Sequence, residues 1–147
     1  MACDLGFEPI ANFLLSRGAN PSQMCGKEKE QWTALHNAAA KGQVQIAQML
    51  LDYGANPLDK DNQVSFISFK HFFCFTPLYY IQGYTAFHRA IQYDQLSIVK
   101  FFIDRRLLID AQSIELAKHY NRTLILDLLL VVQHLHKLKR QESLQVR

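Results

Sequence analysis

The chain has 147 residues, of which 49% are hydrophobic and 20% are charged, a balance typical of a folded domain and not of a disordered segment. The formal net charge of +3 lies in residues 133–147, which carry four cations and one anion. The other residues carry 12 cations and 12 anions, so the composition argues against a nucleic-acid-binding surface on the body of the protein.

The cysteines and the first residues indicate a reducing compartment. Cys3, Cys25 and Cys74 have no paired spacing, so the sequence predicts neither a disulfide framework nor a zinc site. Residues 1–4 lack a basic start followed by an apolar run, so no secretory signal is predicted. We therefore expect the protein in the cytosol or the nucleus.

The first predicted helix lies within residues 2–15, whose pattern matches that of residues 38–51. The second copy follows a Thr-Ala-Leu-His motif at residues 33–36, but no such motif precedes the first copy. The chain thus begins inside a repeating unit, and one unit of a repeat array cannot bury its apolar face alone. We expect that the natural protein extends further towards its N-terminus.

The same motif recurs as Thr-Ala-Phe-His at residues 85–88. The two motifs are followed by similar runs, at residues 38–51 and 90–103, in which apolar side chains recur at helical spacing. They are preceded by Gly-Ala-Asn-Pro, at residues 18–21 and 54–57. Several motifs recur together in one order, which indicates an array of equivalent units.

These units resemble the ankyrin repeat, which has a period of about 33 residues and combines a turn, a Thr-Pro-Leu-His motif and two antiparallel helices. Ala34 and Ala86 stand where the family usually has proline. The resemblance implies an all-α fold, an ankyrin-type helix-turn-helix solenoid. It also implies that the motif histidines His36 and His88 bond backbone atoms between repeats and do not bind metal.

The local chemistry of the motifs agrees with this fold. Thr33 and Thr85 can accept a backbone N–H and so begin the first helix of each unit. Ile46 and Leu50 fall on one stripe of the second helix. Gly54 suits the left-handed conformation that follows many helix ends.

An aromatic-rich insert interrupts the inter-repeat turn before the second motif. Thr85 lies 52 positions after Thr33, 19 more than the period of about 33, and removing the 19 residues 64–82 restores a regular turn. The insert holds seven of the chain's 17 aromatic residues and a single charge, Lys70.

Three interpretations of the insert stay open. The first is a translated intron, because Val64-Ser65 is compatible with a common 5′ splice start, GTA-AGT, and Gln82 with a common 3′ splice end, CAG. The second is an apolar binding loop at a repeat tip, where insertions in repeat arrays occur. The third is a membrane segment, although the insert is marginal in length and contains Lys70 and Pro77.

The C-terminal part looks like a degenerate final repeat with a short turn, followed by a basic tail. We expect a repeat domain over residues 1–132 and a tail over residues 133–147. The repeat domain is expected to contain a truncated repeat at residues 1–21 and two full repeats at residues 22–57 and 58–106. The second full repeat includes the insert at residues 64–82, and the degenerate repeat follows at residues 107–132. The basic stretch 134–140 is interpreted as a solvated helix end, with a nuclear-import or acidic-partner patch as the alternative.

No catalytic motif occurs in the sequence: it has no phosphate-binding glycine loop, no Gly-x-Ser-x-Gly and no His-Glu-x-x-His. His134 and His136 lie two positions apart on a predicted helix, point to different faces and are poorly placed to share a metal ion. We therefore predict no enzyme activity, cofactor, metal site or small-molecule substrate.

The resemblance implies a partner-binding surface on the concave side of the stack, made of turn tips and the outer positions of the first helices. Carried over to this sequence, the expected contact residues are Lys29, Glu30, Trp32, Ala40, Lys41, Tyr53, Asn62, Gln63, Tyr84, Gln92, Tyr93, Arg105, His119 and Tyr120. Side chains of Trp, Tyr and Arg commonly anchor interfaces, and the anchors expected here are Trp32, Tyr84, Tyr93 and Arg105.

The predicted function is therefore a non-catalytic scaffold or adaptor that binds a partner protein. The alternative is an ankyrin accessory segment of a larger enzyme whose catalytic domain lies outside this chain.

Overall fold

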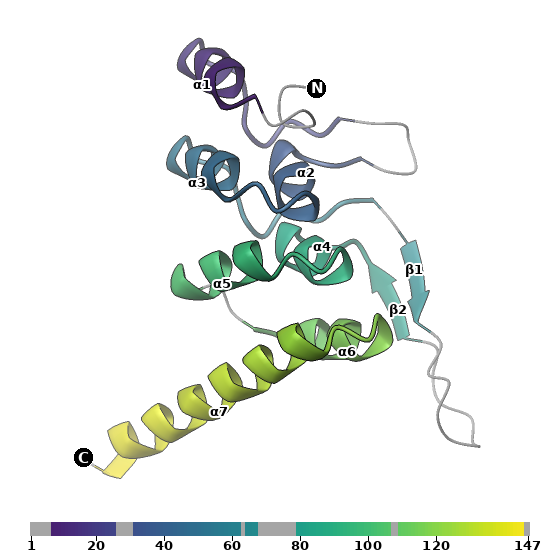
Figure 1. Ribbon diagram of the computed structural model, residues 1–147, viewed down its shortest axis with the longest axis vertical. Coiled ribbons are helices and arrows are strands. Elements are labelled where there is room, and N and C mark those ends of the chain that lie inside the picture. Colours follow the sequence, from purple (N-terminus) through teal and green to yellow (C-terminus); the bar gives the residue numbers. More distant parts are fainter. Residues whose placement is uncertain (1–6, 26–30, 63, 68–78, 107–108, 146–147) are drawn as a thin grey trace.

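The computed structural model describes the chain in five stretches, residues 7–25, 31–62, 64–67, 79–106 and 109–145. Its helices stack in two layers (Figure 1). The inner layer contains α2 (Ala34–Ala40), α4 (Ala86–Gln92) and α6 (Ala111–His119). The outer layer contains α1 (Glu8–Ser16), α3 (Val44–Asp52), α5 (Leu96–Asp104) and α7 (Thr123–Gln145). The expected helix-turn-helix solenoid is confirmed.

The inner helices begin at the predicted threonines. The Oγ1 atoms of Thr33 and Thr85 accept the backbone N–H of His36 and His88, respectively. Each imidazole returns the bond, because its Nδ1 accepts the threonine N–H at 3.2 Å. These reciprocal bonds form a capping box in which histidine replaces the usual Glu or Gln. Helix α6 begins instead at Asp110, whose Oδ1 accepts the Ser113 N–H at 2.8 Å.

Two positions after the end of each inner helix, one residue has a left-handed backbone, which turns the chain back towards the outer layer. These equivalent residues are Gly42 (φ 71°), Asp94 (φ 62°) and Asn121 (φ 54°). Gly, Asn and Asp tolerate this conformation best, so the turn between the two helices of a unit is specified by one residue in each.

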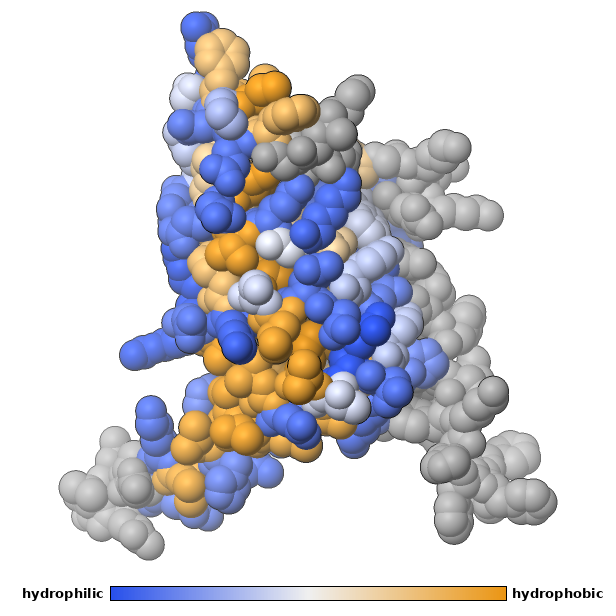
Figure 2. All heavy atoms as spheres, viewed as in Figure 1, coloured by the Kyte–Doolittle hydropathy of each residue, from blue (hydrophilic) through white to orange (hydrophobic). Residues whose placement is uncertain are grey.

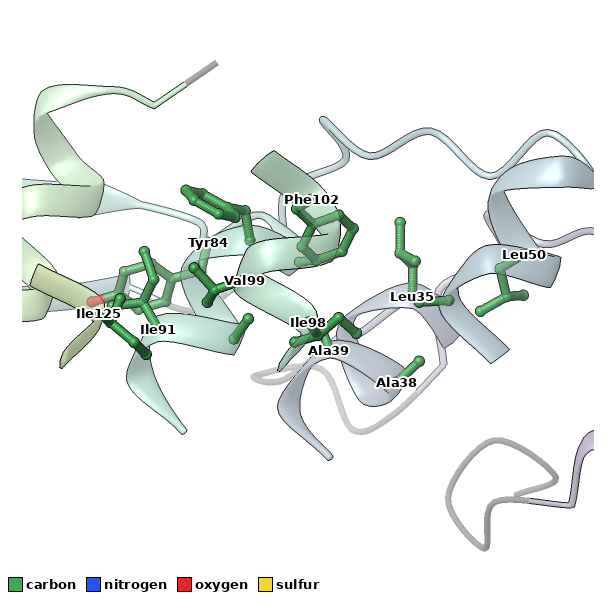
Figure 3. Close-up of a cluster of buried hydrophobic side chains, with 14 of the residues drawn as sticks. Leu35, Ala38, Ala39, Leu50, Tyr84, Ile91, Ile98, Val99, Phe102 and Ile125 are labelled. Atoms are coloured by element: carbon green, nitrogen blue, oxygen red, sulfur yellow. The ribbon is translucent and has the colours of Figure 1, made fainter. Parts of the chain in front are cut away.

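The core lies between the layers (Figure 3). Ala38, Ala39 and Ala90 are fully buried, and their small side chains let α2 and α4 approach closely. Larger side chains fill the space between the inner and outer helices, among them Ile98 and Phe102 of α5. The apolar stripes predicted for the second helices thus face the core.

The ends of the insert form an antiparallel hairpin, β1 (Val64–Ile67) and β2 (Tyr79–Gln82). Val64 pairs with Gln82, so the hairpin begins and closes at the two predicted ends of the insert. Residues 68–78, with Lys70 and Pro77, lie outside the described part of the chain. The repeats are all-α as expected, but this pair of strands is an addition that the sequence did not predict.

Helix α7 continues without a break from Thr123 to Gln145 and crosses the expected boundary between residues 132 and 133. The residues expected to form a basic tail therefore belong, as far as Gln145, to the same helix as the end of the last repeat. The C-terminal part of α7 projects beyond the stack (Figure 1). None of the described helices is long and apolar enough to cross a membrane.

Candidate protein-binding surface

A buried ion pair joins the turn before α4 to the helix itself. Arg89 is 1% exposed, and its Nε donates to Asp61 Oδ2 at 2.7 Å. The other carboxylate oxygen of Asp61 accepts the Tyr84 N–H at 2.8 Å. Burying a charge is costly unless it is paired and hydrogen-bonded, and these contacts satisfy both carboxylate oxygens. The pair therefore fixes the position of the guanidinium.

The Arg89 guanidinium lies between aromatic rings of two successive repeats. Its carbon is 4.6 Å from the centre of the Trp32 ring and 4.8 Å from that of Tyr84. Trp32 in turn meets Tyr93 edge to face, with 6.1 Å between ring centres and 77° between planes. Cation–π contacts of this kind strengthen when the cation is shielded from water. The buried guanidinium of Arg89 thus helps to fix the positions of the Trp32 and Tyr84 rings.

Hydrogen bonds extend this arrangement to the next repeat. Arg89 Nη1 donates to Gln92 Oε1 at 2.6 Å, and Gln92 Nε2 donates to the Tyr120 hydroxyl at 3.0 Å. Arg122 Nη2 donates to the Gln92 carbonyl at 2.8 Å. The chain of contacts connects α4 with the end of α6 and the beginning of α7.

We call this set of five side chains the inner row: Trp32, Arg89, Gln92, Tyr93 and Tyr120. Tyr93 is 47% exposed, whereas Trp32, Gln92 and Tyr120 are partly buried. The row therefore presents aromatic and amide groups to solvent from a base that is fixed by Arg89. Such a surface suits recognition of another protein.

The motif histidines act as inter-repeat links. His36 Nε2 donates to the Tyr84 carbonyl at 2.7 Å, which confirms the expected backbone bond. Burial lowers the pKa of His36 from its ordinary value of 6.5, although the bond to Tyr84 opposes this shift. The imidazole is thus kept neutral, with its Nδ1 free of a proton so that it can accept from Thr33.

His88 differs, and the expectation of a backbone partner is wrong for it. Its Nε2 bonds a carboxylate, Asp110 Oδ1, at 3.2 Å. Burial would raise the pKa of Asp110, but hydrogen bonds from His88 and Ser113 outweigh burial and hold that pKa well below its ordinary value. The reason is that α6 begins at an aspartate, whose side chain reaches the space that a backbone carbonyl fills between α2 and α4.

Burial corrects two of the expected surface residues. Tyr84 is 1% exposed and Ala40 is 8% exposed, so neither offers a surface for a partner in this structure. The Tyr84 ring packs beneath Arg89 because the ion pair draws the guanidinium across it.

Two further expected residues lie on the outer layer, away from the inner helices. Tyr53 ends α3 and its hydroxyl donates to Asn12 of α1 at 3.3 Å. Arg105 ends α5 and contacts Asp52 and Phe101, both on outer helices. The two helices of each unit lie in different layers, so residues that end outer helices are separated from residues that end inner helices. The expected single row therefore divides into two groups.

The remaining expected residues fall in three groups. Lys41 and His119 are exposed at or near the ends of α2 and α6. Asn62 is exposed at the turn and donates to Gln31 at 2.8 Å. Lys29, Glu30 and Gln63 lie outside the described residues.

Sequence reasoning missed Arg89 and Asp61, which organise the surface. Arg89 occupies the position that Asn37 holds in the preceding unit, so an alignment of the two units shows a change to a cation there. Asp61, in the turn before the insert, is the anion that could pair with this cation. Among the described residues, no three His, Cys, Asp or Glu side chains are grouped to hold a metal ion.

Comparison with known families identifies the repeats. A family model described as ankyrin repeats, in three copies, matches residues 1–115. No curated protein matches the sequence.

Proposed function

The chain belongs to the ankyrin-repeat family, and on this premise we propose that it is a scaffold or adaptor that binds a partner protein through the inner row. Ankyrin-repeat domains are typically non-catalytic and generally bind proteins. The partner surface proposed here comprises the inner row and its exposed neighbours Lys41, Asn62 and His119. The turn-tip residues Lys29, Glu30 and Gln63 extend the proposal.

The observation that carries this proposal is the fixed geometry of the exposed rings. The Asp61–Arg89 pair is buried, and Arg89 contacts Trp32 directly while Trp32 contacts Tyr93. A surface that is already ordered loses less side-chain entropy when a partner binds. Tyr and Trp are also the side chains that most often dominate interface free energy.

Affinity capture from cell extract with quantitative mass spectrometry tests the proposal. The bait proteins are the wild type, a Tyr93→Ala/Tyr120→Ala variant and the control Tyr53→Ala. Tyr53 has an exposed fraction of 45%, close to the 47% of Tyr93, but it lies on the outer layer. We expect partners that the Tyr53→Ala protein retains and the double variant loses, with an affinity at least about tenfold lower in direct binding.

The opposite pattern contradicts the inner row. If every reproducible partner binds the double variant as well as the wild type, and circular dichroism shows both folded, the partner surface lies elsewhere. A partner lost only with Tyr53→Ala transfers the site to the outer layer.

The compartment is part of the same proposal. The three cysteines show no paired spacing in the sequence, which favours a reducing compartment, the cytosol or the nucleus.

A further inference from the structure

The inner row offers more hydrogen-bond donors than acceptors. The Tyr120 hydroxyl oxygen accepts from Gln92, and the amide oxygen of Gln92 accepts from Arg89. The main-chain carbonyl of Gln92 accepts from Arg122 at 2.8 Å. By contrast, the hydroxyl groups of Tyr93 and Tyr120 donate to none of the described residues. A partner that brings acceptors and few donors therefore complements this surface.

The indole group of Trp32 is a further donor in the row. Its Nε1 atom is buried and has no hydrogen-bond partner among the described residues. Trp32 lies edge to face with Tyr93, whose own hydroxyl is a donor. The excess of donors therefore extends from the end of α6 to the turn before α2.

The row presents neither an unbalanced charge nor an aliphatic surface. Its one charged side chain, Arg89, is buried against Asp61. Asp94, the neighbour of Tyr93, lies 3.7 Å from Arg122, so these two charges balance each other. The row contains no aliphatic side chain, and in Figure 2 the apolar residues (orange) continue from the stack on to α7, which is not part of the row. These features argue against a phosphorylated or acidic motif, which needs an arginine cluster, and against an amphipathic helix, which needs an apolar groove.

Two tyrosines of the row occupy equivalent positions on successive inner helices. Tyr93 is the C-cap of α4 and Tyr120 is the C-cap of α6, and each is followed by a residue with left-handed backbone. Packed helices lie about 8–10 Å apart, so equivalent positions on them recur after about that distance. A polyproline II segment has about three residues per turn and rises about 3.1 Å per residue, so every third side chain recurs after about 9 Å. Prolines three positions apart therefore match the spacing of the inner helices.

Proline also matches the hydrogen bonding and the rings. It has a carbonyl acceptor but no backbone N–H, and the carbonyl groups of a polyproline II segment make no internal hydrogen bonds. The hydroxyl groups of Tyr93 and Tyr120 can donate to these carbonyls. Aromatic-lined surfaces bind such segments because the conformation is formed in advance and little entropy is lost on binding.

We propose that the inner row binds a proline-rich segment of the partner protein, in polyproline II conformation, whose prolines lie three positions apart and pack on Tyr93 and Tyr120. The tyrosine hydroxyl groups donate to carbonyl groups of the segment. This inference rests on the proposed function, because it names the chemistry of the partner for the same surface.

Two synthetic peptides of the same composition test the proposal on the full chain. The first has about 13 residues with proline at every third position and alanine or serine between. The second contains the same residues rearranged so that no two prolines are three positions apart. We expect the wild-type protein to bind the first peptide at least about tenfold more tightly in fluorescence anisotropy. Added salt should change its affinity by less than about twofold, because no charged pair forms on binding.

Variants assign the binding to the two rings and their hydroxyl groups. Tyr93→Ala and Tyr120→Ala should each weaken binding of the first peptide about tenfold or more. Tyr93→Phe and Tyr120→Phe keep the ring and remove the donor, so each should weaken binding about fivefold while the fold is retained. Tyr53→Ala, on the outer layer, is the matched control and should bind as the wild type does.

Other outcomes overturn the proposal. Equal binding of the two peptides, or no saturable binding of either, excludes a proline-rich segment. A loss with Tyr53→Ala as large as that with Tyr93→Ala removes the inner row from this role. If a partner captured from cell extract is lost with Tyr93→Ala/Tyr120→Ala but neither peptide binds, the proposed function stands and only the chemistry assigned to the partner is wrong.

Discussion

Arg89 is the residue on which the inner row depends. Its side chain contacts Asp61 in the turn, two aromatic rings from successive repeats, and Gln92. A neutral side chain of similar length could fill the same volume but could not balance the charge of the buried carboxylate. The cation therefore couples the turn before α4 to the exposed side of the stack.

Arg89→Met should lower the free energy of unfolding by about 3–5 kcal/mol, because it leaves the Asp61 carboxylate buried without its cation. The double variant Asp61→Asn/Arg89→Met should lose less, since the introduced asparagine keeps an acceptor for the Tyr84 N–H and carries no charge. Urea unfolding at neutral pH measures all three proteins. A double variant less stable than Arg89→Met would show that the ion pair itself, and not the unpaired charge, determines the loss.

The sequence predicts the capping threonines and histidines correctly because each threonine lies three positions before its histidine. Local helix geometry alone brings the two side chains together. The Asp61–Arg89 pair could not be predicted this way, since its members lie 28 positions apart with the insert between them. The burial of Tyr84 follows from that pair and was missed with it. The outer placement of Tyr53 and Arg105 was missed because their positions in the repeat do not tell which layer of helices they end.

At the scale of elements, a backbone hydrogen bond closes the turn of the interrupted repeat at the base of the insert. The Asp61 N–H donates to the Tyr84 carbonyl at 3.0 Å, as the Cys25 N–H does to the Trp32 carbonyl at 2.8 Å in the preceding unit. Gly83 has φ +77°, and a Cβ there would overlap the Asp61 carbonyl oxygen. The base of the turn thus has contacts of its own, outside the strands β1 and β2.

Deletion of residues 64–82 should give a more soluble protein that melts at an equal or higher temperature. Gln63 would join Gly83, leaving three residues between Asp61 and Tyr84, and a three-residue hairpin loop commonly has glycine with positive φ at its last position. Loss of the loop changes closure entropy by only about 1 kcal/mol, whereas removal of an aromatic-rich loop lowers the tendency to aggregate. Thermal melting and sedimentation of soluble protein measure the two effects.

The mature transcript separates the interpretations of the insert. A transcript without the 57 nucleotides that encode these 19 residues supports a translated intron. A transcript that keeps them, together with a deletion protein that does not fold, makes residues 64–82 a structural or binding loop.

Helix positions follow from the sequence where period and caps agree, as in α2 to α5. The hairpin was missed because the insert has no alternating pattern and no glycine at its centre. The continuity of α7 past residue 132 was missed for a different reason: a change to basic composition was taken for a boundary, yet lysine and arginine are good helix formers.

At the scale of the whole molecule, burial is distributed unequally along the stack. In a solenoid each unit is stabilised mainly by its neighbours. Helix α5 buries Ile98, Val99 and Phe102 completely. Helix α1 buries only Ala11 and Leu15.

Hydrogen exchange should therefore begin at the N-terminal end. On α1 and its N-cap the side chains of Phe7, Ile10, Phe13 and Leu14 are between 46% and 57% exposed, so opening this helix exposes little further apolar surface. We expect amides of α1 to exchange about a hundredfold or more faster than those of α4 and α5, a difference of about 3 kcal/mol in opening free energy. Exchange measured by mass spectrometry on peptides from each helix tests this. Ala11→Ser should speed exchange in α1 and leave α5 unchanged, because local opening does not involve the centre. Equal protection of α1 and α5 would show instead that the described stack opens as one cooperative unit.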